Sequence, residues 1–429
     1  MRKLYASILS LEESQMRDTI LYSFGSLCSS AASMILLLVV TRIMGQELSG
    51  VFSLAWSASQ LMLTVGWFGT RQYQVSDVVG AISYYEYFIA KIISSGIMLV
   101  LGCAYVYIYR YETQTKIITL FLCAMMIADV FADFFSGFFQ CNNRLYIGGS
   151  SYAVRNISYV LVFAVTMLLF RNLIFSIICA IVTEMLWLFF FDYQLVKMIP
   201  KKNKSVRIRA IAKLFVECTP LFFGSFMNTF IVNVPKNAID LYMDYNSQAS
   251  YNILFMPTAV INLLNMFICV PFYTRMAVLW QENQRKVFLK DVRRITGLVM
   301  LITVGVLIGG ALLGIPVLSW LYGVELRSYR NAFLVLILGG GFYGVVSALT
   351  YVITVFRKQR VIIYVYIVCA VLAQLFVGTL VRNFKMMGAA VTYTVTLGAI
   401  CLALVLYIWY YLRKYDNNGG GEKYEEISE

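Results

Sequence analysis

The sequence predicts an all-α polytopic membrane protein with twelve transmembrane helices in two six-helix lobes. The 429 residues are 60% hydrophobic and only 13% charged, whereas a soluble domain is about 45–50% apolar and about 25% charged. Long apolar runs recur along the whole chain, and a basic segment divides them into two equal sets. These three observations exclude an ordinary soluble fold.

The spanning helices are predicted from runs of about 18 or more apolar residues, the length that crosses a bilayer. Twelve such runs cover residues 19–41, 49–70, 88–109, 117–140, 147–170, 173–195, 211–234, 249–271, 295–317, 331–356, 361–381 and 387–412.

The domain organisation follows from the basic segment between the sixth and seventh runs. Because six spans are an even number, both halves enter the membrane in the same orientation, which predicts a parallel pseudo-two-fold repeat. The expected parts are a cytoplasmic N-terminal segment 1–18, an N-lobe 19–199, a basic cytoplasmic linker 200–210, a C-lobe 211–412 and a disordered cytoplasmic tail 413–429.

The orientation is predicted from lysine and arginine, which favour the cytoplasmic side of a membrane. With the N-terminus inside, the inner segments hold 25 of these residues and the outer segments hold 9. Both termini are therefore expected to be cytoplasmic. The net charge of +13 is explained by this topology and gives no reason to expect nucleic acid as a partner.

Prolines are confined to the second half, apart from Pro200 in the linker. Thr219 and Pro220 have the residue types of a helix N-cap and first helical position. Pro235 and Pro257 lie further inside spans and are predicted to bend them. We therefore expect the seventh and eighth spans to be the more deformable ones.

Charged residues within spans are costly and need a reason to be there. Asp129 and Asp133 are one helical turn apart, Glu184 lies midway along the sixth span, and Glu217 lies early in the seventh. Two interpretations stay open for these four carboxyl groups: ion coupling, or structural polar contacts between helices.

Three arginines, Arg42, Arg71 and Arg155, lie in or at the ends of the first, second and fifth spans. Arginine suits a phosphate ligand because its planar fork is always charged and bidentate. The alternative for each is anchoring at the membrane interface.

A polar stripe follows one face of the seventh span, in the stretch "NVPKNAID". Its members Asn233, Lys236, Asn237 and Asp240 are spaced by three and four residues. Polar groups facing lipid would be left unsatisfied, so the stripe predicts a wet cavity or, for Lys236 and Asp240, an ion pair.

Catalysis and metal binding are not predicted. The chain has no histidine, which removes histidine metal sites and Ser-His catalysis. No nucleotide-binding or hydrolase motif is present. We therefore expect a protein that is not an enzyme and uses no metal or cofactor.

Four segments resemble one transporter family: "VTRIMGQELSGVFSLAWS", "FFQCNNRLYIGGSSYAVRNISYVL", "NVPKNAIDLYMDYNSQASYNILFMPTAVINLL" and "KMMGAAVTYTVTLGAI". They are similar to the bacterial polysaccharide-biosynthesis flippases of the multidrug/oligosaccharidyl-lipid/polysaccharide exporter superfamily. The resemblance extends over the whole chain, but its motifs are diffuse.

The resemblance implies a flippase that moves an undecaprenyl-diphosphate-linked oligosaccharide to the outer leaflet of a bacterial inner or plasma membrane by alternating access. Its cationic cavity would accept the diphosphate and sugars, and Arg42, Arg71, Arg155 and Lys236 match that expectation. A coupling cation, proton or sodium, and glycan polymerase machinery are further partners that the resemblance leaves open.

Alternatives remain beside the flippase. A multidrug or small-molecule exporter of the same superfamily has the same fold and span count. A membrane glycan polymerase is disfavoured because all loops are short, and a major-facilitator transporter is disfavoured because the loop after the second span lacks its glycine- and arginine-rich motif.

Overall fold

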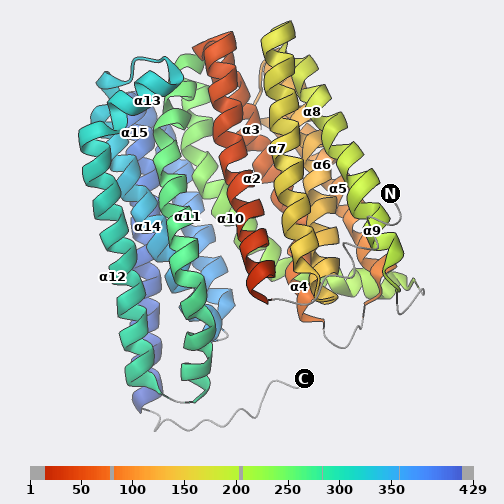
Figure 1. Ribbon diagram of the computed structural model, residues 1–429. Helices are drawn as coiled ribbons and strands as arrows, with labels where there is room; N and C mark the ends of the chain where they lie inside the picture. The colour runs from red at the N-terminus through yellow and green to blue at the C-terminus, as the bar shows by residue number, and fades with distance from the viewer. Residues whose placement is uncertain (1–14, 78–81, 202–205, 283, 357, 418–429) are drawn as a thin grey trace. The chain divides into compact units, whose positions relative to one another are not determined.

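The computed structural model describes residues 15–77, 82–201, 206–282, 284–356 and 358–417. Every secondary-structure element in these ranges is helical (Figure 1), which confirms the all-α class. Most of the predicted N-terminal segment and the end of the predicted tail lie outside the described residues.

Ten helical segments in the described part are long and apolar enough to cross a membrane. One of them, within α15 (Gln359–Asn417), contains two of the predicted runs, and the predicted run 249–271 falls in α11 (Tyr245–Gln281). The chain is therefore a multi-pass membrane protein.

The described residues form two compact units. Unit 1 comprises those of Met1–Met256 and Ile315–Ser328, and unit 2 those of Pro257–Gly314 and Tyr329–Glu429. The boundary falls inside α11, at the peptide that joins Met256 to Pro257, and not at the basic linker. The lobes 19–199 and 211–412 thus stay a prediction from the sequence.

Unit 1 is a bundle of helices that run nearly side by side in Figure 1. Its elements are α2 (Gln15–Met44), α3 (Gln46–Trp67), α4 (Thr70–Ser76), α5 (Tyr84–Ile108), α6 (Thr113–Cys141), α7 (Leu145–Phe170), α8 (Leu173–Trp187), η1 (Leu188–Asp192), α9 (Tyr193–Met198), α10 (Ile208–Tyr242), the start of α11 and α13 (Ile315–Tyr322).

The largely buried α3 packs against α2, α5, α6 and α10 at the centre of unit 1. The helices α2 and α7 approach closely where glycines meet, since a Cβ built on Gly25 would lie 2.5 Å from the carbonyl oxygen of Gly149. Small residues of this kind let helix backbones pack tightly in a membrane.

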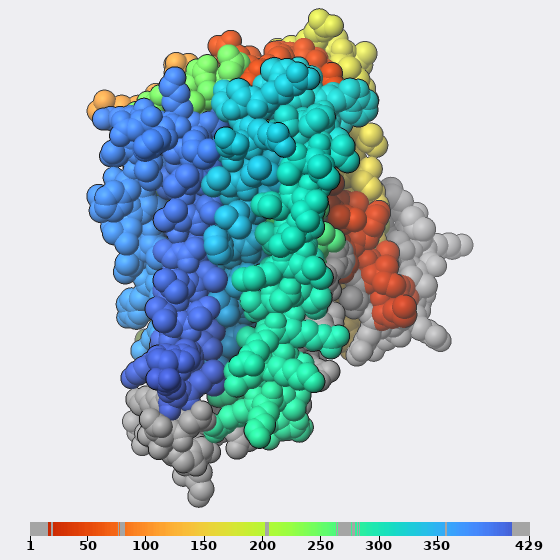
Figure 2. Space-filling view, turned by 90° about the vertical axis from the view of Figure 1, so that its left-hand side faces the viewer, coloured from red at the N-terminus to blue at the C-terminus, as the bar shows by residue number. Residues whose placement is uncertain are grey.

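Unit 2 contains the rest of α11 together with α12 (Arg285–Gly309), η2 (Gly310–Gly314), α14 (Arg330–Val355) and α15. Its core is formed where α14 packs on α12 and α15. Figure 2 shows the face of this unit that carries α12 and α15. Large apolar side chains are exposed on both helices, among them Leu301, Ile308, Leu375 and Phe376. A lipid environment is what such a surface requires.

The predicted second span, 49–70, corresponds to α3, and a break at its end separates it from the short helix α4. Phe68 and Gly69 both have left-handed backbone conformations, with φ of 47° and 67°. A Cβ on Gly69 would also lie 2.7 Å from Cβ of Leu221 in α10. Glycine fits this position because it has no Cβ to clash and adopts positive φ freely.

Pro220 and Lys385 lie at two predicted helix boundaries, and both fall inside long helices of the structure. The prediction that Thr219 and Pro220 begin a helix is wrong, because α10 begins at Ile208 and continues through Pro220 and Pro235. Membrane helices tolerate proline in their interior where surrounding groups satisfy the backbone groups that the proline leaves free. In α15, Lys385 is the non-helical residue (φ 50°, ψ −129°) between the two predicted runs.

Candidate functional site

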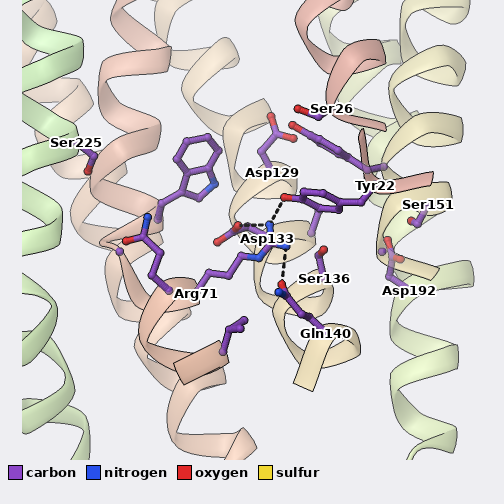
Figure 3. A pocket seen from close by; sticks show the side chains of 17 residues that line it. Tyr22, Ser26, Arg71, Asp129, Asp133, Ser136, Gln140, Ser151, Asp192 and Ser225 are labelled. Carbon is purple, nitrogen blue, oxygen red and sulfur yellow. Dashed lines mark hydrogen bonds and ion pairs between the residues drawn. The ribbon is translucent and has the colours of Figure 1, made fainter. Parts of the chain in front are cut away.

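A cavity of about 710 Å³ lies inside unit 1 (Figure 3). It is formed by α2, α3, α4, α6, α7, η1 and α10, which converge around polar side chains. The lining residues include Tyr22, Ser26, Trp67, Arg71, Gln72, Asp129, Asp133, Ser136, Gln140, Ser151, Tyr152, Asp192 and Ser225. Three predicted site residues, Arg71, Asp129 and Asp133, are brought together here.

Arg71 is the cation that lines this cavity, and the break between α3 and α4 puts it there. It is the second residue of α4, two positions after the left-handed Gly69. Its Nη1 donates to the Tyr22 hydroxyl at 2.6 Å and to Asp133 at 3.4 Å, and its Nη2 donates to Gln140 at 3.2 Å. Figure 3 shows these three contacts. The Arg71 side chain keeps 19% of its surface exposed.

Lys91 contacts Asp133 and is not among the site residues predicted from the sequence. Its side chain is 1% exposed. Its Nζ donates to the other oxygen of Asp133 at 3.3 Å and to the backbone carbonyl of Trp67 at 3.1 Å. The side chain therefore joins the end of α3 to α6.

A second ion pair closes another wall of the cavity. Arg155 of α7 donates from Nη2 to Asp129 of α6 at 2.5 Å. Arg155 is fully buried, and its Nε and Nη1 have no hydrogen-bond partner in the structure. Since Arg155 does not line the cavity, its effect on a ligand there would pass through Asp129.

Glu184 and Asp192 lie on the sixth predicted span, close to this pair. Glu184 is fully buried and interacts electrostatically with Arg155 and Asp129, and neither of its carboxyl oxygens has a hydrogen-bond partner among the residues that the structure describes. Asp192, which the sequence reasoning missed, ends the π-helix η1 and lines the cavity. Single π-helical turns often mark functional positions in longer helices.

The polar stripe of α10 contacts other helices of unit 1 and does not line this cavity. Lys236 donates to Ser57 of α3 at 2.9 Å and lies 5.0 Å from the ring centre of Phe255. Asn237 donates to the Tyr105 hydroxyl of α5 at 2.6 Å. Lys236 and Asp240 both lie in the described part of the chain, and they do not form an ion pair with each other.

The other stripe residues and two further candidates also lie away from the cavity. Asn233 is buried and donates to the carbonyl of Thr229. Arg42 donates to the carbonyls of Trp320 and Leu321 near the end of α13. Glu217 forms an ion pair with the exposed Lys213 at 3.6 Å, one turn away on α10.

The cavity can therefore offer one guanidinium, three carboxyl groups and a set of hydroxyl and amide groups. The guanidinium and the amides of Gln72 and Gln140 suit phosphate oxygens. The hydroxyl and carboxyl groups suit a ligand rich in hydroxyl groups, such as a sugar, because each can accept or donate hydrogen bonds.

Comparison with known proteins identifies the family. The model of the family "Polysaccharide biosynthesis protein" matches residues 16–276, more than half of the chain. No curated protein matches the chain by sequence.

Solved structures of similar fold include the lipid II flippase MurJ in an inward closed conformation, at a TM-score of 0.69 and 14% identity over 91% of this chain and 87% of that one. A transporter of the multidrug/oligosaccharidyl-lipid/polysaccharide (MOP) superfamily from Pyrococcus furiosus has a TM-score of 0.62 at 11% identity, over 93% and 94%.

An outward-facing multidrug resistance transporter of the MATE family, also of the MOP superfamily, has a TM-score of 0.61 at 12% identity, over 93% and 94% of the two chains. At such identities the likeness shows a shared fold. With the family match, it establishes that this chain belongs to the polysaccharide biosynthesis protein family and has the fold of MOP superfamily transporters.

Proposed function

We propose that this protein is a flippase for undecaprenyl-diphosphate-linked oligosaccharide repeat units. It would move them from the cytoplasmic to the outer leaflet of a bacterial cell membrane by alternating access, for cell-surface polysaccharide. The observation that supports this most directly is the position of Arg71, which lines a cavity among hydroxyl and amide groups.

The physical requirement is the transfer of a charged, hydroxyl-rich headgroup across about 30 Å of hydrocarbon. Fixed cations, amides and hydroxyl groups replace the water shell that a diphosphate and its sugars lose. The lipid tail can remain in the bilayer. The apolar surfaces of the helices are compatible with this arrangement.

The topology that we propose has twelve spans, with α15 counted as two and α11 as one. Both termini are cytoplasmic in this proposal, and the spans group into lobes 19–199 and 211–412 around the linker 200–210. The positive-inside bias of the sequence supports the orientation. It places Arg71, at the end of the second span, on the cytoplasmic side, where the headgroup is captured.

In this proposal, Lys236 binds the headgroup in the outer part of the membrane, together with Asn233, Asn237 and Asp240. Lys236 is held by a serine hydroxyl and an aromatic ring, and not by a carboxylate in the described part of the chain. A cation without such a partner can accept an anionic ligand without breaking an ion pair.

Energy coupling would fall to the carboxyl groups of Asp129 and Glu184. The oxygens of Glu184 have no hydrogen-bond partner in the described part of the chain although the side chain is fully buried, so a proton or a sodium ion would satisfy them. Flipping in proteoliposomes under an imposed proton or sodium gradient tests this. Glycan polymerase machinery would act on the product in the outer leaflet.

A second candidate function has its own observation. Asp129, Asp133 and Asp192 line the cavity together with Trp67 and Tyr152. Carboxyl groups and aromatic rings suit organic cations, as a multidrug exporter would need.

Deletion of the gene separates the two functions. The flippase proposal expects lipid-linked oligosaccharide to accumulate in the cytoplasmic leaflet and surface polysaccharide to be lost. Unchanged polysaccharide together with increased sensitivity to cationic drugs would favour the exporter.

A further inference from the structure

Asp133 is shared by two cations that differ in how freely they can move. Its Oδ1 is 3.4 Å from Nη1 of Arg71, and its Oδ2 is 3.3 Å from Nζ of Lys91. The Arg71 side chain is 19% exposed and lines the cavity, whereas the Lys91 side chain is 1% exposed and does not line it.

Lys91 is fixed in place by the break between α3 and α4. The carbonyls of Gly66 and Trp67 come at the end of α3, where the helix no longer supplies N–H donors four residues on. Ser94 donates to the first carbonyl at 2.8 Å and Lys91 to the second at 3.1 Å. If Lys91 moved away, a carbonyl and a carboxylate would both lose a donor.

Arg71 has contacts that can be exchanged. Besides Asp133, it contacts the neutral groups of Tyr22 and Gln140, which also line the cavity and remain accessible to a ligand. If Arg71 turns toward an anion, Asp133 keeps the charge of Lys91 beside it. No unpaired carboxylate is then left in the interior, a state that would be costly.

We propose that Lys91 is a positioning residue that holds Asp133 neutralised, so that Arg71 is available to the phosphate of the substrate. The identity of the anion as a lipid-linked diphosphate rests on the proposed function. The sharing of Asp133 between two cations does not.

Removal of Lys91 should have a specific effect. In Lys91→Met, Arg71 becomes the sole cation beside Asp133, so that releasing it would leave the carboxylate unpaired. Arg71 should then be held back from ligands. Adding Asp133→Asn removes the charge that holds it, and Arg71 should be released again.

The first experiment needs no substrate. Purified protein in detergent is treated with phenylglyoxal, which modifies guanidinium groups, and modification of Arg71 is quantified by peptide mass spectrometry. We expect Lys91→Met to slow modification of Arg71 about tenfold. Asp133→Asn and Lys91→Met/Asp133→Asn should both react at least as fast as the wild type. Lys213→Met, which removes an exposed lysine of α10, is the matched control and should change nothing.

The second experiment measures binding of undecaprenyl diphosphate to the same variants. Lys91→Met should weaken binding about tenfold, and the double variant should recover to within about threefold of the wild type. If Lys91 only stabilises the fold, Asp133→Asn will restore neither binding nor reactivity, because it does not replace the bond from Lys91 to the Trp67 carbonyl, which then keeps only the Thr70 hydroxyl as a donor.

The outcomes separate the two proposals. Unchanged or faster Arg71 modification in Lys91→Met, or failure of Asp133→Asn to reverse the slowing, overturns the role of Lys91. If the variants show the expected phenylglyoxal reactivity of Arg71 but the wild-type protein does not bind undecaprenyl diphosphate, the proposed substrate is refuted and the role of Lys91 stays supported. Should Lys91→Met not fold, slower Arg71 modification in Asp133→Asn would overturn the proposal by itself.

Discussion

Arg155 and Asp129 form an ion pair between α7 and α6, with 2.5 Å between Nη2 of the arginine and Oδ1 of the aspartate. The arginine is fully buried while the aspartate reaches the cavity. Glu184 interacts electrostatically with the same arginine and has no hydrogen-bond partner within the described ranges. The guanidinium is thus the ion-pair partner of Asp129, and it also interacts electrostatically with Glu184 and Asp192.

Replacing this buried arginine should therefore reduce stability more than substitutions of the residues that line the cavity. Arg155→Met leaves Asp129 without its ion-pair partner, and we expect a loss of about 3–5 kcal/mol of unfolding free energy. Thermal unfolding of the purified protein measures it. Arg155→Met/Asp129→Asn should recover part of the loss. Equal stability of Arg155→Met and the wild type would show that the pair contributes nothing.

Replacing Lys236 should reduce transport and leave stability nearly unchanged, in contrast to replacing Arg155. Its contacts are the Ser57 hydroxyl and the Phe255 ring, so Lys236→Met leaves no carboxylate unpaired among the described residues. We expect protein levels near wild type together with clearly reduced polysaccharide export. Ser57→Ala, which keeps the charge, is the control and should retain most of the export. Normal export by Lys236→Met would remove Lys236 from the transport path.

Arg71 offers a test of the guanidinium itself. Arg71→Lys keeps the positive charge but cannot contact Tyr22, Gln140 and a phosphate in one planar arrangement. We expect a several-fold loss of flipping in reconstituted vesicles, and background activity for Arg71→Met. If the lysine variant flips as fast as the wild type, a point charge is sufficient and the bidentate contact is not used.

Most spanning helices could be predicted from the sequence, because the apolar run that marks a span extends over the whole length of the helix. The predicted span 88–109 corresponds to α5 and the predicted span 147–170 to α7. Helix ends were harder to predict. The predicted helix start at Pro220 is wrong, because Pro220 lies inside α10. Membrane helices tolerate proline where their surroundings satisfy the freed backbone groups, and a local sequence pattern does not contain those surroundings.

The candidate site could be predicted only in part. Arg71, Asp129 and Asp133 stood out because charges inside apolar runs are rare. Lys91 and Asp192 did not, since each lies near a span end, where a charge usually reaches water. Lys91 donates to the carbonyl of Trp67 at the break after α3, and Asp192 is the last residue of the π-helix η1. Neither feature has a signal in the sequence of the span that carries the charge.

The break between α3 and α4 itself can be tested with a single methyl group. Gly69→Ala places a Cβ 2.7 Å from Cβ of Leu221, at a φ of 67° that L-residues rarely adopt. We expect a loss of at least about 1–2 kcal/mol of unfolding free energy and slower flipping, because Arg71 follows the break directly.

Gly96→Ala in α5 is the matched control. It lies within a helix, and a Cβ there meets nothing within 4 Å. Alanine should therefore be neutral or stabilise the protein by up to about 1 kcal/mol. Thermal unfolding and flipping of the two variants are compared side by side. A Gly69→Ala protein as stable and active as Gly96→Ala would show that the backbone at position 69 adopts another conformation in the membrane, and that Arg71 does not owe its place to a left-handed turn.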